Sequence, residues 1–164
     1  MNAQMSNAAL SLLLFLLLGA TYILFLLWII SRISGWALLA RRFRANEPFY
    51  GETWSWQSAR FRLMGGYNNC LTVGANQEGI SLSVMPIMFP LRLFHPALLI
   101  PWQEIEVETG KMFFGLRDTA RFRIGAQERV TVRIYGKLVQ RMRQAAGPGW
   151  PLYPMEQIDA QTRG

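Results

Sequence analysis

Positions 9–30 form an apolar stretch, and no charged side chain occurs among them. As an α-helix these 22 residues would be about 33 Å long, enough to cross a hydrocarbon core of about 30 Å. A cleaved signal peptide begins with basic residues and has a shorter apolar stretch, whereas residues 1–8 contain no Lys or Arg. The pattern therefore predicts a retained transmembrane helix over residues 9–31, preceded by a short N-terminal segment of residues 1–8.

Positive charge follows this apolar stretch and does not precede it. Because Lys and Arg are held on the cytoplasmic side of a membrane, the sequence predicts a single-span membrane protein. Residues 1–8 would lie outside, and the rest of the chain would lie in the cytoplasm.

Residues 32–49 form a basic segment next to the predicted span, and two interpretations of it stay open. Its apolar side could rest on lipid while the arginines reach headgroups, or it could be a plain stop signal. Trp28 and Trp36 either lie at the membrane–water boundary, which suits an indole, or pack within and below the helix. The predicted membrane-interface residues are Trp28, Arg32, Trp36, Arg41, Arg42 and Arg44.

From Thr53 onward apolar and polar residues alternate, which is the pattern of half-buried strands. Glycine and asparagine clusters at 65–69, 76–79 and 125–128 predict turns. After the last strand, Leu138, Met142 and Ala145 recur with the spacing of one helical face. The alternation predicts strands over 55–63, 70–73, 80–84, 98–108, 112–124 as one long or two short strands, and 130–134, followed by a helix over 137–145.

This order of elements predicts an α+β fold. A small, twisted antiparallel sheet bends on itself and leaves one end of its core open, and an apolar helix face can close that end. One compact domain over residues 50–146 follows, and the Gly- and Pro-rich residues 147–164 are expected to form a flexible tail.

Three segments carry a resemblance to a known family: Gly79-Ile80-Ser81-Leu82-Ser83, the stretch 99–105, and the final strand with its helix. They resemble pleckstrin-homology-like (GRAM-like) domains. The whole chain is similar to uncharacterised bacterial membrane proteins with one N-terminal span and such a domain. The resemblance covers residues 50–146 and implies a barrel-like scaffold for lipid or protein contacts without catalytic residues. It brings no phosphoinositide site, because the turn 65–69 contains no Lys or Arg.

The formal charge of the chain is +7, and it is unevenly distributed. Residues 32–62 carry +4 and residues 111–143 carry +7, with an acidic stretch between them. A basic domain tethered under a cytoplasmic leaflet is expected to be attracted to anionic lipid headgroups. Nucleic acid is not an expected partner, because the predicted span argues against it and no recognition motif occurs. The single cysteine, Cys70, excludes an internal disulfide.

Arginines recur on the outward side of the late strands. The candidate basic face consists of Arg121, Arg123 and Arg133. Glu104, Glu106 and Glu108 share one side of an earlier strand by their spacing of two. Either these glutamates pair with the arginines across strands, or the arginines stay available for lipid phosphate or an acidic partner.

The loop 85–96 contains three prolines and is otherwise almost wholly apolar. Prolines forbid a regular central strand, and an exposed apolar surface of this kind indicates a membrane or protein contact. The alternative is that the loop folds over the sheet as part of the core. The candidate contact residues are Ile87, Met88, Phe89, Leu91, Leu93 and Phe94.

Catalytic chemistry is not expected from this chain. His95 and Cys70 are its only histidine and cysteine, and no nucleotide, metal or hydrolase motif occurs. We therefore expect no enzyme activity, cofactor or metal. The predicted function is a membrane-anchored, non-catalytic interaction module that docks on a membrane protein partner or on anionic lipid. The alternative is a small accessory or assembly subunit of a larger membrane complex. Such a subunit would be held mainly through its helix, where Gly19-Ala20-Thr21 allows close approach.

Overall fold

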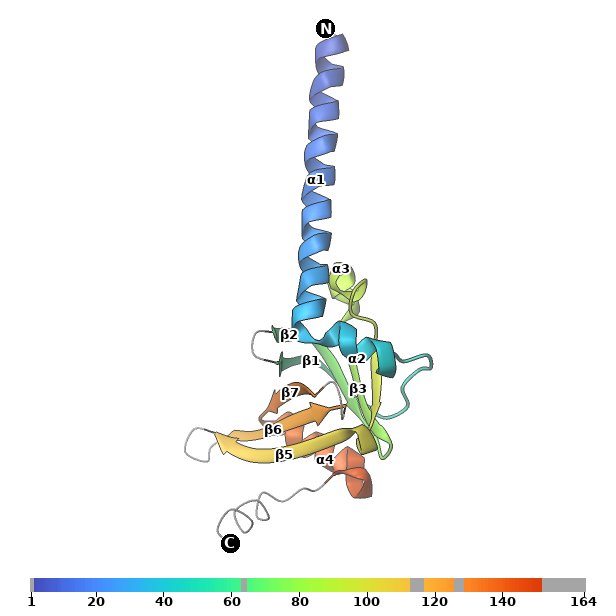
Figure 1. Ribbon diagram of the computed structural model, residues 1–164, viewed down its shortest axis with the longest axis vertical. Helices are drawn as coiled ribbons and strands as arrows, with labels where there is room; N and C mark the ends of the chain where they lie inside the picture. The colour runs from blue at the N-terminus through green and yellow to red at the C-terminus, as the bar shows by residue number, and fades with distance from the viewer. Residues whose placement is uncertain (1, 63–64, 113–116, 126–128, 152–164) are drawn as a thin grey trace.

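A computed structural model describes residues 2–62, 65–112, 117–125 and 129–151 (Figure 1). A long helix projects from a β domain, and the two parts meet at the base of the helix. The helices are α1 (Asn2–Ser34), α2 (Trp36–Phe43), α3 (Phe89–Arg92) and α4 (Lys137–Ala146). The strands are β1 (Glu52–Phe61), β2 (Gly65–Ala75), β3 (Gly79–Val84), β4 (Leu98–Pro101), β5 (Ile105–Met112), β6 (Arg117–Ile124) and β7 (Val130–Tyr135).

Helix α1 is continuous over the predicted apolar stretch and extends beyond it at both ends. Residues Asn7–Ser34 are long and apolar enough to cross a membrane by length and composition, a property that a signal sequence shares. The side chains of its upper part are exposed, and the β domain reaches only its lower end (Figure 1).

The chain turns sharply at Gly35, where φ is +83°. This left-handed conformation is unfavourable for residues that have a Cβ atom. A Cβ at Gly35 would also lie 3.2 Å from both methyl groups of Val130. The turn directs α2 along the domain, so that the apolar side of α2, formed by Trp36, Leu39 and Phe43, is buried there. Of the two interpretations left open for this segment, the one in which its apolar side rests on lipid is therefore wrong, because the domain itself covers that side.

Seven strands form one antiparallel sheet in the order β4-β3-β2-β1-β7-β6-β5. The two edge strands follow each other in the chain, separated only by a 3₁₀ turn over Trp102–Glu104. A sheet whose edges are three residues apart must curve back on itself, and the result is a nearly closed barrel (Figure 1). The predicted α+β class, with an antiparallel sheet and a C-terminal helix, is confirmed.

The predicted alternation fills the barrel. Val130, Val132 and Ile134 of β7 are buried while Arg133 points outward, and β3 and β6 follow the same period of two. Helix α4 buries Leu138, Val139, Met142 and Ala146 against the open end.

Two local predictions were wrong. The stretch 98–108 is not one strand, because Pro101 precedes the 3₁₀ turn that carries the chain from β4 to β5. The residues 65–69 belong to β2 and are not a turn. For 112–124, predicted as one long or two short strands, Met112 is the last residue of β5 and residues 117–124 form β6, while residues 113–116 lie outside the described part of the chain.

The beginning of the expected tail is packed. Trp150 is buried and contacts Trp102 and Phe122, with ring centroids 5.3 and 5.9 Å apart. Gly149 lies so close to the carbonyl of Gln77 that a Cβ would collide with it. These contacts close the barrel end beside α4, and residues 152–164 lie outside the described part of the chain.

Candidate functional site

A buried polar chain joins the base of α1 to the β domain. The hydroxyl of Ser31 donates to the carbonyl of Phe94 at 2.7 Å. The phenolic oxygen of Tyr67 lies 3.0 Å from Ser34 Oγ and 2.7 Å from His95 Nε2. Trp36 Nε1 donates to the carbonyl of Pro96 at 2.9 Å. We call these residues, Ser31, Ser34, Trp36, Tyr67 and His95, the junction.

The hydrogen bonds and the burial of the junction determine the protonation states of His95 and Tyr67. His95 Nδ1 lies 2.8 Å from the carbonyl of Leu91, which can only accept, so Nδ1 carries the proton and Nε2 is an acceptor that shares the single Tyr67 hydroxyl proton with Ser34 Oγ. Burial lowers the pKa of His95 below its ordinary value of 6.5, and the bond to Leu91 opposes that shift. Burial raises the pKa of Tyr67 to about 12. Both groups are therefore neutral at pH 7.

The junction is expected to weaken in mild acid. Because the pKa of His95 is lower in the folded chain, the unfolded state binds more protons just below pH 6.5. The stability that neutral His95 contributes is complete above about pH 6.5 and decreases as the pH falls through the folded pKa. Thermal unfolding of the full chain in detergent, between pH 8 and pH 5, should show a falling midpoint.

His95 is the only histidine, which makes the matched control simple. His95→Gln keeps an amide that can donate to Leu91 and accept from Tyr67 but does not titrate, so its midpoint should change less between pH 7 and pH 5. Equal slopes for both proteins would contradict this origin of the acid sensitivity.

The loop 85–96 has buried ends and an exposed middle. Met85 and His95 are buried, Leu91 and Phe94 are half-buried, and Ile87, Phe89 and Leu93 are 71%, 65% and 56% exposed. Met88 is also exposed. Helix α3, which contains Phe89, lies beside the lower end of α1 (Figure 1). The loop is therefore partly core, and its exposed residues are Ile87, Met88, Phe89 and Leu93.

The predicted membrane-interface residues separate into two groups. Trp36 is completely buried against Phe61, Tyr67 and His95, so its proposed place at a membrane boundary is wrong. Trp28 is exposed on α1, with the guanidinium of Arg32 5.1 Å from its ring centre. Arg41 and Arg44 are exposed, and Arg42 forms an ion pair of 2.6 Å with Glu104.

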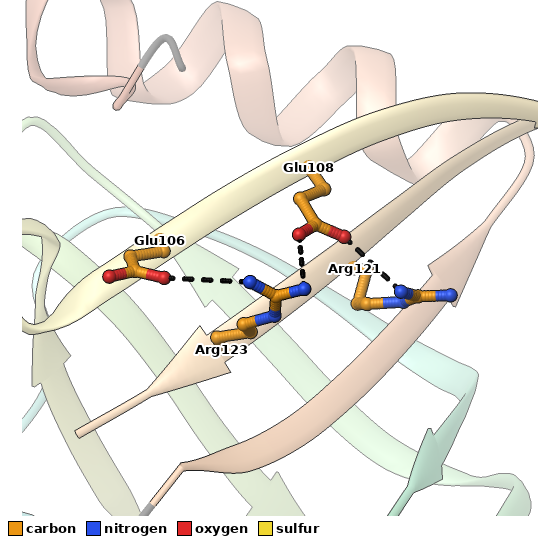
Figure 2. A network of polar contacts seen from close by, with 4 residues as sticks. All are labelled: Glu106, Glu108, Arg121 and Arg123. Atoms are coloured by element: carbon orange, nitrogen blue, oxygen red, sulfur yellow. Dashed lines mark hydrogen bonds and ion pairs between the residues drawn. The ribbon is translucent and has the colours of Figure 1, made fainter. Parts of the chain in front are cut away.

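Two of the three candidate basic-face residues have carboxylate partners (Figure 2). Arg121 contacts Glu108 at 3.2 Å, and Arg123 bridges Glu108 and Glu106. The register explains this, because Glu106 and Glu108 of β5 lie opposite Arg123 and Arg121 of β6. Glu104 does not share their strand, since it lies in the 3₁₀ turn.

Arg133 differs from these two, because no carboxylate among the described residues pairs with it. Its side chain lines an open hollow of about 470 Å³ on the outer side of β6 and β7. Sequence reasoning missed two further arginines of this hollow, Arg62 and Arg129, because the left-handed backbone that follows β1 and precedes β7 at these positions leaves no signal in the alternation. We call it the arginine hollow, and its lining residues are Arg62, Arg121, Arg123, Arg129, Thr131 and Arg133.

The described part of the chain contains few side chains that could act as a nucleophile or bind a metal ion. Burial raises the pKa of the Cys70 thiol, which favours the unreactive protonated form. Both ring nitrogens of His95 are engaged by Tyr67 and Leu91. Among the described residues, no three His, Cys, Asp or Glu side chains group closely enough to hold a metal ion.

Comparison with protein-family models, curated proteins and solved structures found no match to this chain.

Proposed function

We propose that this protein is a membrane-anchored, non-catalytic interaction module. In this proposal α1 spans a bacterial inner membrane with its N-terminus outside. The β domain is held against the cytoplasmic surface, where it docks on a membrane protein partner or on anionic lipid headgroups. The observation that carries the proposal is the exposed apolar surface of Ile87, Phe89 and Leu93 beside the base of α1. An exposed apolar patch next to an apolar helix suits the boundary of a membrane.

The junction supports a retained helix. Ser31 and Ser34 are buried and hydrogen-bonded to the domain, and α1 continues through them without a break. Cleavage of the chain directly after the apolar stretch would fall next to Ser31 and Ser34, whose hydroxyl groups are hydrogen-bonded to the domain. A signal peptide has no such need to be integrated with the mature fold.

The charge and the topology also agree with the proposal. Arg32, Arg41 and Arg44 are exposed near the base of α1, where they could meet anionic headgroups. A seven-stranded antiparallel sheet closed by a C-terminal helix is compatible with the pleckstrin-homology-like scaffold that the sequence resembles.

Spin labels would test where the exposed apolar residues lie. We suggest replacing the buried Cys70 by alanine, labelling Phe89→Cys with a nitroxide, and reconstituting the chain in phosphatidylcholine–phosphatidylglycerol vesicles. The label should collide more often with oxygen, which partitions into lipid, than with a water-soluble nickel chelate.

A label at Gln77→Cys is the matched control, since Gln77 is exposed at the β2–β3 turn, at the end of the domain away from α1. It should show the opposite preference. If the label at position 89 is as accessible to the nickel chelate as the label at position 77, the proposed place of the loop is wrong.

The alternative function, an accessory subunit held through its helix, has one observation in its favour. A Cβ at Gly19 would meet nothing within 4 Å, and no described segment covers this part of α1. A second helix could therefore approach closely. Replacing residues 9–26 by an equally long Leu-Ala helix would retain the span. Loss of a membrane partner from this chimera, with retention in Phe89→Ser, would favour the alternative over the loop contact.

A further inference from the structure

We propose that the arginine hollow is a binding site for a phosphate group, with Arg62, Arg129 and Arg133 as its principal ligands. This inference does not depend on the membrane placement proposed above, because every residue of the hollow belongs to the β domain.

Like charges line up across three strands at the hollow. Arg133 of β7 lies directly opposite Arg60 of β1 on one side and Arg121 of β6 on the other. Like charges directly opposite each other destabilise a sheet. Glu108 neutralises part of this row at its outer end through Arg121, but no described carboxylate reaches Arg133. An anion at Arg133 would offset the repulsion.

The other two principal ligands, Arg62 and Arg129, lie at strained backbone positions. Arg62 and Arg129 have φ values of +48° and +43°, which ordinary side chains avoid. Both flank the same part of the sheet, since the Arg62 N–H donates to the carbonyl of Thr131 at 2.8 Å. Strain of this kind gathers at functional sites. Here it brings two guanidinium groups to the hollow, one after β1 and the other before β7.

The arrangement matches a phosphate group better than a carboxylate. A carboxylate is planar and offers two oxygens, and those of Glu108 are already taken, one by Arg121 and the other by Arg123. Arg62, Arg129 and Arg133 come from three separate backbone positions around an open hollow, and Thr131 adds a hydroxyl at its wall. A phosphate group has more acceptor oxygens and more charge to distribute among several guanidinium groups.

One wall of the hollow adjoins the turn below α1. The Nε atom of Arg62 would be 3.1 Å from a Cβ at Gly35, so its guanidinium covers that turn. The phosphate group could therefore belong to a lipid headgroup or to a soluble molecule. Both sources present the same chemistry to the arginines, and the experiment separates them.

The test uses the full chain in a non-ionic detergent at constant ionic strength, with titration calorimetry. One arm adds inorganic pyrophosphate, and the other adds dioctanoyl phosphatidic acid in mixed micelles, with dioctanoyl phosphatidylcholine as reference. Saturable binding of pyrophosphate indicates a soluble source, and binding of the phosphatidic acid alone indicates a headgroup. Binding of neither overturns the proposal.

Variants connect the binding to the hollow. Arg133→Gln should weaken binding about tenfold, the loss expected for one charge-assisted hydrogen bond. Arg129→Gly should weaken binding by a similar factor and also raise the thermal midpoint without ligand, because glycine accepts a positive φ. A purely structural arginine would not show this opposition between binding and stability.

Arg141→Gln is the matched control. Arg141 is exposed on α4, away from the hollow, and its loss changes the net charge equally. Its affinity should stay within twofold of the parent chain. If Arg141→Gln weakens binding as much as Arg133→Gln does, binding is a net-charge effect and the site does not exist.

Discussion

Replacing Trp36 by alanine is expected to lower the free energy of unfolding of the β domain by about 3–5 kcal/mol. The indole is completely buried, and the rings of Phe61, Tyr67 and His95 lie 5.2–5.6 Å from it, centre to centre. The substitution leaves a cavity under α2 and removes the only side-chain donor to the Pro96 carbonyl among the described residues. Urea unfolding of the full chain in detergent, followed by near-ultraviolet circular dichroism, would measure the loss.

Trp28→Ala is the matched control. Trp28 is exposed on α1 and its ring contacts Phe25 and Arg32 of the same helix, so the domain should lose less than about 0.5 kcal/mol. Equal losses for the two variants would contradict the assignment of Trp36 to the domain core.

Trp150→Ala is expected to have an effect of similar size, about 3–5 kcal/mol. Its ring closes the barrel end by packing on Trp102 and Phe122, so removal exposes that end to water. Trp150→Phe should cost much less, about 1 kcal/mol. Nε1 of Trp150 is buried without a hydrogen-bond partner among the described residues, and its loss removes an unfavourable burial. Thermal unfolding of the parent chain, Trp150→Phe and Trp150→Ala would give their order of stability.

A chain in which Trp150→Phe is as unstable as Trp150→Ala would show that the indole N–H is satisfied in solution. If neither variant differs from the parent chain, the barrel end does not depend on residue 150.

The strands and the two longest helices could be predicted because their patterns are local. The period of two in 130–134 indicates a strand with one buried face, and the helical spacing in 137–145 indicates a helix with one buried face. Neither pattern depends on which element covers that face. The covering element could not be predicted in the same way. The apolar side of 36–43 has the pattern of a lipid-facing helix and of a domain-facing helix alike, and only the turn at Gly35 decides between them.

The candidate site was predicted in part for a similar reason. Strand alternation places Arg121, Arg123 and Arg133 on one outward side, and the register then gives two of them carboxylate partners. Arg129 lies outside any periodic pattern, and Arg62 lies in the predicted strand 55–63 but just beyond the observed end of β1; the left-handed backbone at both positions could not be read from the alternation. The packed Trp150 was missed because Gly147, Pro148 and Pro151 indicate an end to helix but not a loss of burial.

Because the base of α1 is hydrogen-bonded to the β domain, the helix and the barrel are expected to move together. The part of α1 above the junction, residues 7–30, would be about 36 Å long, which exceeds a hydrocarbon thickness of about 30 Å. A helix longer than its bilayer tilts, and it tilts more where the bilayer is thin. If α1 spans a membrane as proposed, that tilt would turn the whole barrel as well, because Ser31 and Ser34 are hydrogen-bonded to the domain, and the orientation of the barrel would depend on the local thickness of the lipid.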